Sequence, residues 1–219
     1  DALPISTLIA ASPEVIPTPP DYPWHVHMTG FLYLDHGAEW SPPQDLLKFL
    51  EAGDPPVYIG FGSMTGHASD DMTLLIKALD GRRAVLSQGW SDMQSSKLPD
   101  SVHLLTGAPH DWLFPRMSAV VHHGGAGTLA ASLRACVPIL VIPHLADQFY
   151  YGRRVHELGV GPKPIPRRKL DAQSLKSALD DLLENESFQK ESEHLGEKFQ
   201  KEAGVENIVG VIDGYLQDE

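Results

Sequence analysis

The sequence predicts an α/β fold, a Rossmann-like parallel sheet flanked by helices, on two observations. Short apolar runs of strand length alternate with segments whose apolar residues recur at helical spacing, which is typical of parallel strands joined by right-handed crossovers. One of these runs, at 119–121, leads into a glycine-rich turn and then into a helix-like segment. Backbone that turns in this way at a strand end can approach a ligand closely, so we expect a binding site there.

Composition narrows the classes of protein to consider. The chain has 219 residues, of which 42% are hydrophobic, enough for one substantial core. Its formal charge of −12 argues against a nucleic-acid partner, which would require basic clusters. Its one cysteine, Cys136, excludes a disulfide framework. No apolar run reaches membrane-spanning length and no signal segment opens the chain, so we expect a soluble, cytoplasmic protein.

Residues 1–51 are predicted to be an approach segment, the linker and remnant of a preceding half, and residues 52–219 form the main domain. Frequent prolines rule out long helices in the first part and favour extended connections. Short strands are expected within Thr7–Ala11 and Val26–Leu34, and a short helix over Asp45–Leu50.

The main domain is predicted to alternate strands with helices. The expected strands are Val57–Gly62, Arg83–Ser87, Val102–Leu105, Ala119–Val121 and Ile139–Ile142. The expected helices contain 72–79, the residues after Thr128, the residues after Asp147, the segment that Asp171 caps, 188–199 and 205–216. The carboxyl ends of parallel strands meet at one edge of a sheet, so the residues that follow them are expected to share one crevice. These residues are Ser63, Trp90, Gly107–His110, His123 and Asp147.

The turn that follows 119–121 has the composition of an anion site. Its glycines are Gly124, Gly125 and Gly127. The helix that begins there points free N–H groups and its positive dipole end at the turn. His123 and the hydroxyl of Thr128 can each donate to a phosphate oxygen, and Ser63 offers a second hydroxyl. The alternative is a structural turn in which His123 is a satisfied interior histidine.

Two further positions suit the rest of a ligand. Asp147 and Gln148 follow the strand at 139–142, and a carboxylate beside an amide suits a polyol. An anion cradle followed by such a pair indicates a sugar phosphate or a nucleotide-sugar. Trp90, at the end of the strand at 83–87, is either a stacking platform for a base or partly buried packing.

Five phrases occur together in the chain: Val57–Met64 (VYIGFGSM), Pro109–Phe114 (PHDWLF), Val121–Thr128 (VHHGGAGT), Pro143 with Asp147-Gln148, and Glu157–Pro162 (ELGVGP). In their order and spacing they resemble the C-terminal, donor-binding half of a GT-B fold glycosyltransferase of the UDP-glycosyltransferase superfamily. The resemblance extends over roughly 26–170 and is closest to the sterol 3-beta-glucosyltransferases and their bacterial relatives. It implies that residues 52–219 are a nucleotide-sugar donor-binding domain.

The resemblance also implies a role for each matched position. The residues that would bind the donor diphosphate are Ser63, His123, Gly125, Gly127 and Thr128. Asp147 and Gln148 would hold hydroxyls of the transferred sugar, and the loop backbone at Ala108 and His110 would meet the uracil ring.

Two positions depart from the pattern of the plant members of this superfamily. Those members place a tryptophan at the position of Gly107 to stack on the base, and a glutamate at the position of Ala131 to hold the ribose diol. Bacterial and sterol-type members often lack both residues. We therefore expect Trp90 to supply the base contact instead.

The implied reaction is inverting transfer of a hexose, glucose, from a UDP-sugar co-substrate to a hydroxyl of a sterol-like or other lipophilic acceptor, with no cofactor and no obligatory metal. His25 and His27 share one face of an extended segment but have no carboxylate or cysteine at ligand spacing. The general base is expected in the N-terminal half, so no catalytic residue is assigned. This chain alone is expected to bind donor but to transfer sugar poorly.

Two alternatives remain open. One is a glycosyltransferase that uses a thymidine-diphosphate deoxysugar and a natural-product acceptor. The other is a non-catalytic nucleotide-sugar binding module that serves a separate partner. In the full-length enzyme a sterol acceptor would imply peripheral contact with a membrane, and an exposed interdomain face could drive self-association.

Overall fold

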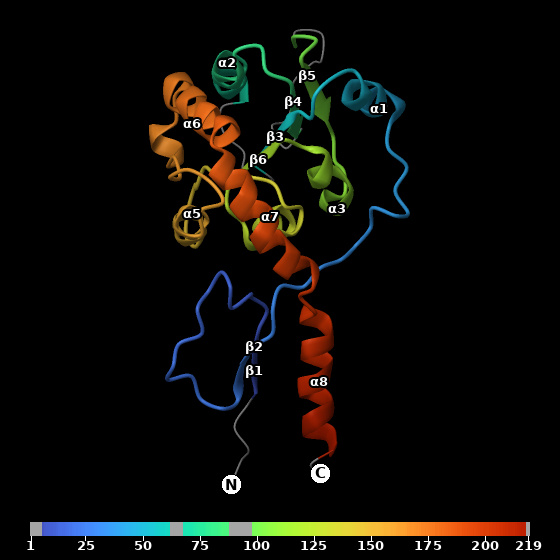
Figure 1. Ribbon diagram of the computed structural model, residues 1–219, viewed down its shortest axis with the longest axis vertical. Coiled ribbons are helices and arrows are strands. Elements are labelled where there is room, and N and C mark those ends of the chain that lie inside the picture. Colours follow the sequence, from blue (N-terminus) through green and yellow to red (C-terminus); the bar gives the residue numbers. More distant parts are fainter. Residues whose placement is uncertain (1–5, 62–67, 88–97, 218–219) are drawn as a thin grey trace.

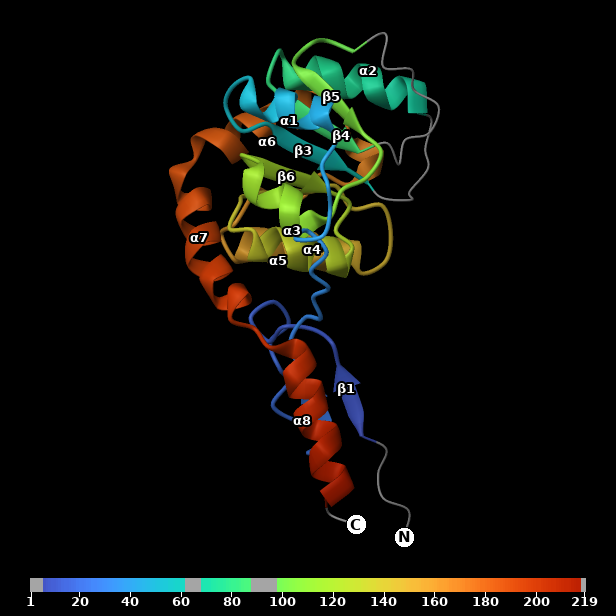
Figure 2. The ribbon, with the colours of Figure 1, turned by 90° about the vertical axis from the view of Figure 1, so that its right-hand side faces the viewer.

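The computed structural model describes residues 6–61, 68–87 and 98–217, and it has an α/β architecture. Five parallel strands form one sheet in the order β5-β4-β3-β6-β7, and helices cover both of its faces (Figure 1). A two-stranded sheet and the C-terminal helix extend away from this body (Figure 2). The predicted Rossmann-like fold class is confirmed.

The strands of the large sheet occupy the apolar runs of the sequence. They are β3 (Val57–Gly60), β4 (Ala84–Ser87), β5 (Val102–Leu105), β6 (Ala119–His122) and β7 (Ile139–Val141). Strand β3 lies at the centre and pairs with β6 so that Gly60 stands opposite His122. Both central strands are buried throughout, as expected for a parallel sheet covered on both faces.

The helices follow the predicted apolar spacing. They are α1 (Gln44–Glu51), α2 (Ala68–Leu79), α3 (His110–Leu113), α4 (Ala126–Arg134), α5 (Gln148–Glu157), α6 (Ala172–Glu184), α7 (Glu186–Gln200) and α8 (Gly204–Gln217), with short 3₁₀ turns at Phe114–Arg116 and Arg167–Lys169. Asp171 caps α6 as predicted, since its side chain accepts a hydrogen bond from the backbone N–H of Ser174 at 2.7 Å. Asn185 caps α7 in the same way.

Alternate residues of the central strands face opposite sides of the sheet. On the side of α2 and α6 the buried cluster includes Ile59, Val121, Leu75, Leu79, Leu175 and Leu179. On the side of α1 and α3 it includes Tyr58, Val120, Leu46, Leu113 and Phe114. Leu46 is fully buried, so α1 contributes to the core of the main domain although it precedes residue 52.

The first residues of the chain meet the last helix. Strand β1 (Thr7–Ile9) pairs in parallel with β2 (Val26–Met28), and α8 runs beside both (Figures 1 and 2). The side chain of Asn207 donates to the backbone oxygen of Thr29 at 2.9 Å. Helix α8 has 14 residues. Within the parts of the chain described above, no helix combines the length and the apolar character that a membrane crossing requires.

Candidate functional site

The turn between β6 and α4 requires glycine at its first bend. Gly124 has φ of +93°, in the left-handed region that side chains disfavour. A Cβ at this position would lie 2.8 Å from Cγ1 of Val141 on the neighbouring strand. The Gly124 N–H donates to Nδ1 of His122 at 3.0 Å. These constraints fix the path by which the chain leaves the sheet and enters α4.

The first turn of α4 is open to a ligand. Gly125 is the residue before the helix, and no side chain from the described residues caps it. The first N–H groups of an α-helix have no partner within the helix, so those of Ala126, Gly127 and Thr128 point out of the helix end. A Cβ at Gly127 would meet no described atom within 4 Å. We call this open helix end, Gly125–Thr128, the cradle; that it binds an anion stays a prediction.

His123 lies over this cradle. A Cβ added to Gly125 would come within 2.5 Å of its Nε2, which places the imidazole edge against the turn. The ring is half-buried, and burial lowers its pKa, while the charge of Asp147 acts in the opposite direction. Its buried Nδ1 has no hydrogen-bond partner among the residues that the structure describes. A neutral imidazole in this position can donate to an anion through one nitrogen.

The two residues predicted to hold the sugar differ in their surroundings. Asp147 stands just before α5, its side chain is exposed, and it makes no capping bond within the described chain. Gln148 is only 6% exposed. Its Oε1 accepts hydrogen bonds from the backbone N–H groups of His144 at 2.8 Å and Leu145 at 3.1 Å. The carboxamide oxygen therefore shapes the loop after β7, and only the NH₂ group of Gln148 is left for a ligand.

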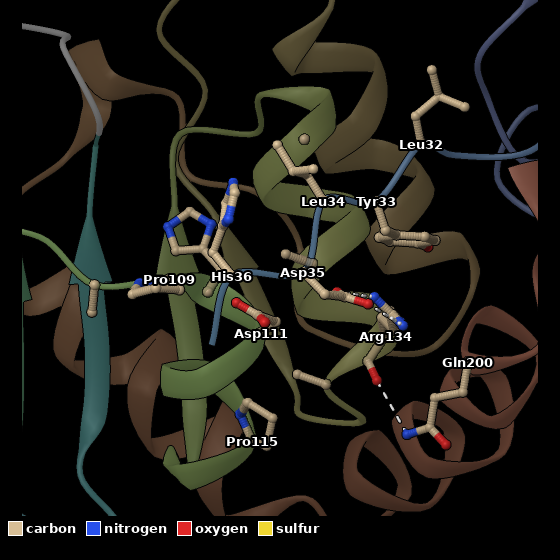
Figure 3. Close-up of a pocket in the computed structure, with 15 residues that line it drawn as sticks. Leu32, Tyr33, Leu34, Asp35, His36, Pro109, Asp111, Pro115, Arg134 and Gln200 are labelled. Atoms are coloured by element: carbon tan, nitrogen blue, oxygen red, sulfur yellow. Dashed lines mark hydrogen bonds and ion pairs between the residues drawn. The ribbon is translucent and has the colours of Figure 1, made fainter. Parts of the chain in front are cut away.

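A pocket of about 730 Å³ adjoins the cradle. Its walls are the segment 32–36, the residues Ala108–Asp111 at the start of α3, and one side of α4 that includes Gly127 and Ala131 (Figure 3). Ala108 and His110, the predicted base contacts, thus lie beside the turn predicted to bind the diphosphate. The His110 ring stacks on Phe114 with ring centroids 4.2 Å apart, and burial lowers its pKa.

Sequence reasoning missed one wall of this pocket. Asp35 forms two hydrogen bonds with Arg134, from Nη1 to Oδ1 at 2.5 Å and from Nη2 to Oδ2 at 3.1 Å. The guanidinium also lies 4.5 Å from the centroid of the Tyr33 ring. Nothing in the spacing of residues so far apart in the chain signals such a pairing.

The structure thus brings most of the predicted positions together. His123, Gly125, Gly127 and Thr128 share one turn, and Asp147 is close enough to influence the pKa of His123. Ser63 and Trp90 lie outside the described residues, so their proposed contacts stay predictions.

Comparison with known proteins gives a consistent picture. Residues 76–212 match the family described as erythromycin biosynthesis protein CIII-like, C-terminal domain. The chain is 42% identical over 209 residues to a sterol 3-beta-glucosyltransferase of Arabidopsis thaliana, covering 94% of this chain and 33% of that protein. It is 40% identical over 218 residues to a sterol 3-beta-glucosyltransferase of Aspergillus fumigatus, covering 92% of this chain and 15% of that protein.

Solved structures agree on the fold. A crystal structure described as the glycotransferase of kitacinnamycin has a TM-score of 0.78 at 18% identity, covering 96% of this chain and 55% of that one. The crystal structure of the calicheamicin glycosyltransferase has a TM-score of 0.76 at 18% identity, and the match covers 99% of this chain and 53% of that one. The expected fold of a GT-B C-terminal domain is thereby confirmed. The chain spans a third or less of the sterol glucosyltransferases quoted above. The match over residues 76–212 shows that the chain belongs to the family of the erythromycin biosynthesis protein CIII-like C-terminal domain.

Proposed function

We propose that this chain is the donor-binding half of an inverting glycosyltransferase that moves a hexose, glucose, from a UDP-sugar to a hydroxyl of a sterol-like acceptor. The observation that carries the proposal is the cradle formed by Gly125, Gly127 and Thr128 beneath His123, with Asp147 beside it. Its open helix end suits a diphosphate, and a carboxylate suits the sugar hydroxyls. The similarity to sterol 3-beta-glucosyltransferases supports the acceptor class.

In the proposed reaction the chain binds and stabilises the leaving group. Negative charge grows on the nucleoside diphosphate as the glycosidic bond breaks, and the N–H groups of α4 face the place where it would grow. An N–H of His123 adds a donor whose strength rises because the site is partly buried. These groups replace the role that a metal plays in other transferases, so the proposal needs no obligatory metal or cofactor.

Deprotonation of the acceptor hydroxyl requires a base within hydrogen-bond reach of it. We assign no residue of this chain to that role and place the base, with the acceptor pocket, in a different part of the full-length protein. The chain alone is therefore expected to bind donor while transferring sugar poorly. We further propose that the full-length protein works in the cytoplasm and contacts a membrane surface to reach its acceptor.

The proposal is tested by calorimetric titration of the chain with UDP-glucose, UDP and thymidine diphosphate. His123→Ala is expected to weaken binding of every diphosphate, because the contact is with the phosphates. Asp147→Ala is expected to weaken the binding of UDP-glucose and to leave the binding of UDP unchanged, because the contact is with the sugar. His194→Ala on α7 and Asp213→Ala on α8, which remove exposed side chains of the same types, are matched controls.

A second candidate is favoured by the natural-product proteins named in the comparisons. In it the donor is a thymidine-diphosphate deoxysugar and the acceptor a natural-product aglycone. Tighter binding of thymidine diphosphate than of UDP in the same titration would select this candidate. Absence of binding to any of the three ligands by a folded sample would reject both transferases, and it would reject the non-catalytic nucleotide-sugar binding module as well.

A further inference from the structure

The ribose of the proposed donor would lie in the pocket beside the cradle, and the side chains of α4 that line this pocket offer no hydrogen-bond acceptor for its hydroxyl groups. The residues of α4 that line the pocket are Gly127 at the near end, Ala131 and the cation Arg134, and Ala135 follows directly after the helix. A ribose carries two adjacent hydroxyl groups, and a carboxylate can accept a hydrogen bond from each. The carboxylates that line the pocket are Asp35, on the segment 32–36, and Asp111, at the start of α3.

Asp35 is held in a fixed orientation. Arg134 binds both of its oxygens, and the guanidinium rests on the face of Tyr33, 4.5 Å from the ring centroid. Figure 3 shows the Asp35–Arg134 pair on the pocket wall, beside Tyr33 and opposite Pro109. The Asp35 side chain is still 57% exposed. Each oxygen keeps a second lone pair, so Asp35 is an oriented carboxylate that can accept further hydrogen bonds.

The segment that carries Asp35, residues 31–37, which we call the strap, is attached at both ends. The N–H of Phe31 donates to Oε2 of Glu202 at 2.8 Å. The N–H of Gly37 donates to Oδ2 of Asp111 at 2.7 Å. The strap is therefore a built wall of the pocket, whose position relative to α4 is set before any ligand arrives.

The position of Asp35 fits the order of groups in a nucleoside diphosphate. Ribose is bonded directly to the diphosphate, so it must lie next to the cradle at Gly127. Arg134 is about two helical turns further along α4. Long side chains of a helix point back toward its N-terminus, so the guanidinium carries Asp35 toward the cradle. Asp111, in contrast, lies at the start of α3 and already uses one oxygen on the strap.

We propose that Asp35, oriented by Arg134, binds the ribose hydroxyls of the donor nucleotide and makes the 2′-hydroxyl a determinant of donor choice. This inference rests on the proposed function and deepens it, because it assigns the specificity for a ribonucleotide donor to the strap. In it Asp35 is a binding residue and Arg134 a positioning residue.

The test compares UDP with 2′-deoxy-UDP, which differ in one hydroxyl group. Calorimetric titration of the wild-type chain is expected to show about tenfold tighter binding of UDP, as for a hydrogen bond to a charged group. Asp35→Ala is expected to bring the ratio of the two dissociation constants close to unity. Glu39→Ala removes an exposed carboxylate that lies outside the pocket, just beyond the strap, and is expected to retain the wild-type ratio.

A variant of the positioning residue adds a second readout. Arg134→Met keeps a long apolar stem but releases Asp35, so the ratio is expected to fall to an intermediate value. Asp111→Asn is expected to retain the preference for UDP. Thermal denaturation of every variant verifies that it is folded.

The outcomes separate this inference from the proposed function. An unchanged ratio in Asp35→Ala, with UDP binding that still depends on His123, would overturn the inference and leave the proposed function standing. Loss of the preference in Asp111→Asn but not in Asp35→Ala would also overturn it. Failure of the wild-type chain to bind UDP would overturn the proposed function and this inference together.

Discussion

The N–H of Gly124 donates to Nδ1 of His122 across the end of β6, at 3.0 Å. His122 is completely buried, which favours its neutral form. Because its Nδ1 accepts the hydrogen bond, the ring proton is on Nε2. The rings of His122 and His123 are nearly perpendicular, at 87°, with centroids 6.3 Å apart. One histidine thus holds the turn from inside, while the next faces the cradle.

Replacement of His122 by phenylalanine is expected to lower the free energy of unfolding by about 1–3 kcal/mol, because it leaves the N–H of Gly124 without an acceptor. Binding of UDP should weaken as well, since the turn that carries the cradle loses its restraint. Asparagine can place its side-chain oxygen near the position of Nδ1, so His122→Asn is expected to retain more stability. Urea denaturation measures both variants. Equal losses would show that the hydrogen bond is not what His122 contributes.

The stability of the chain should depend on pH through the same residue. Burial, followed by the influence of His123 and then of His110, lowers the pKa of His122 from 6.5 to about 3. Between these values the unfolded chain binds a proton at His122 and the folded chain does not. The part of the unfolding free energy that depends on a neutral His122 is therefore fully present above about pH 6.5. It is lost as pH falls toward 3, by about 1.4 kcal/mol per pH unit.

This contribution is isolated by comparing the wild-type chain with His122→Asn, which lacks the titrating group. The other titrating groups are present in both proteins and contribute alike to the pH dependence of their unfolding free energies. The wild-type advantage in unfolding free energy, measured with urea at about pH 7 and about pH 5, is expected to shrink at the lower value. An advantage that does not change with pH would refute the assignment.

Gly124 should tolerate no side chain. Gly124→Ala is expected to cost more than the roughly 1 kcal/mol of left-handed backbone strain, because the new methyl group would also lie 2.8 Å from Val141 Cγ1. Gly81 offers a matched control, with φ of +83° and no described atom within 4 Å of an added Cβ. The difference between the two variants in chemical denaturation measures the close approach alone. Similar costs for both would mean that the turn can widen to admit the methyl group.

Local sequence patterns predicted those parts of the site that depend on neighbouring residues. The path from β6 through the glycines into α4 is encoded within one short stretch, and the cap at Asp171 is read from the residues beside it. The fold class followed from the alternation of strand and helix patterns in the same way. Such patterns can be read from a single sequence, because the residues that interact are close in the chain.

The strap was missed because its contacts have no local signal. Asp35 meets Arg134 from a segment that reads as an extended linker, and only the folded chain places them together. The structural role of Gln148 also has no local signal. The sequence pattern predicts only that its amide binds a sugar, which stays a prediction. The structure shows its oxygen bonded to the loop at His144 and Leu145, a role that depends on the three-dimensional turn.

Helix α8 carries a stripe of exposed apolar side chains. The side chains that form it are Val205, Val209, Ile212 and Leu216, which are between 46% and 66% exposed. Their spacing places them on one side of the helix, whereas Ile208 and Tyr215 are less exposed. A contiguous apolar stripe of this kind favours association in water, so the expected outcome is self-association of the chain as concentration rises.

The stripe is tested by the double variant Val209→Gln, Ile212→Gln. Sedimentation equilibrium is expected to show a concentration-dependent mass for the wild-type chain and a monomer for the variant. The control is Glu206→Gln with Asp213→Asn, which alters exposed polar side chains of the same helix. Binding of UDP should be unchanged in both variants, since α8 contributes no residue to the pocket or the cradle among those described. Association that persists in the double variant would place the contact on another surface, because the two central members of the stripe would then be dispensable.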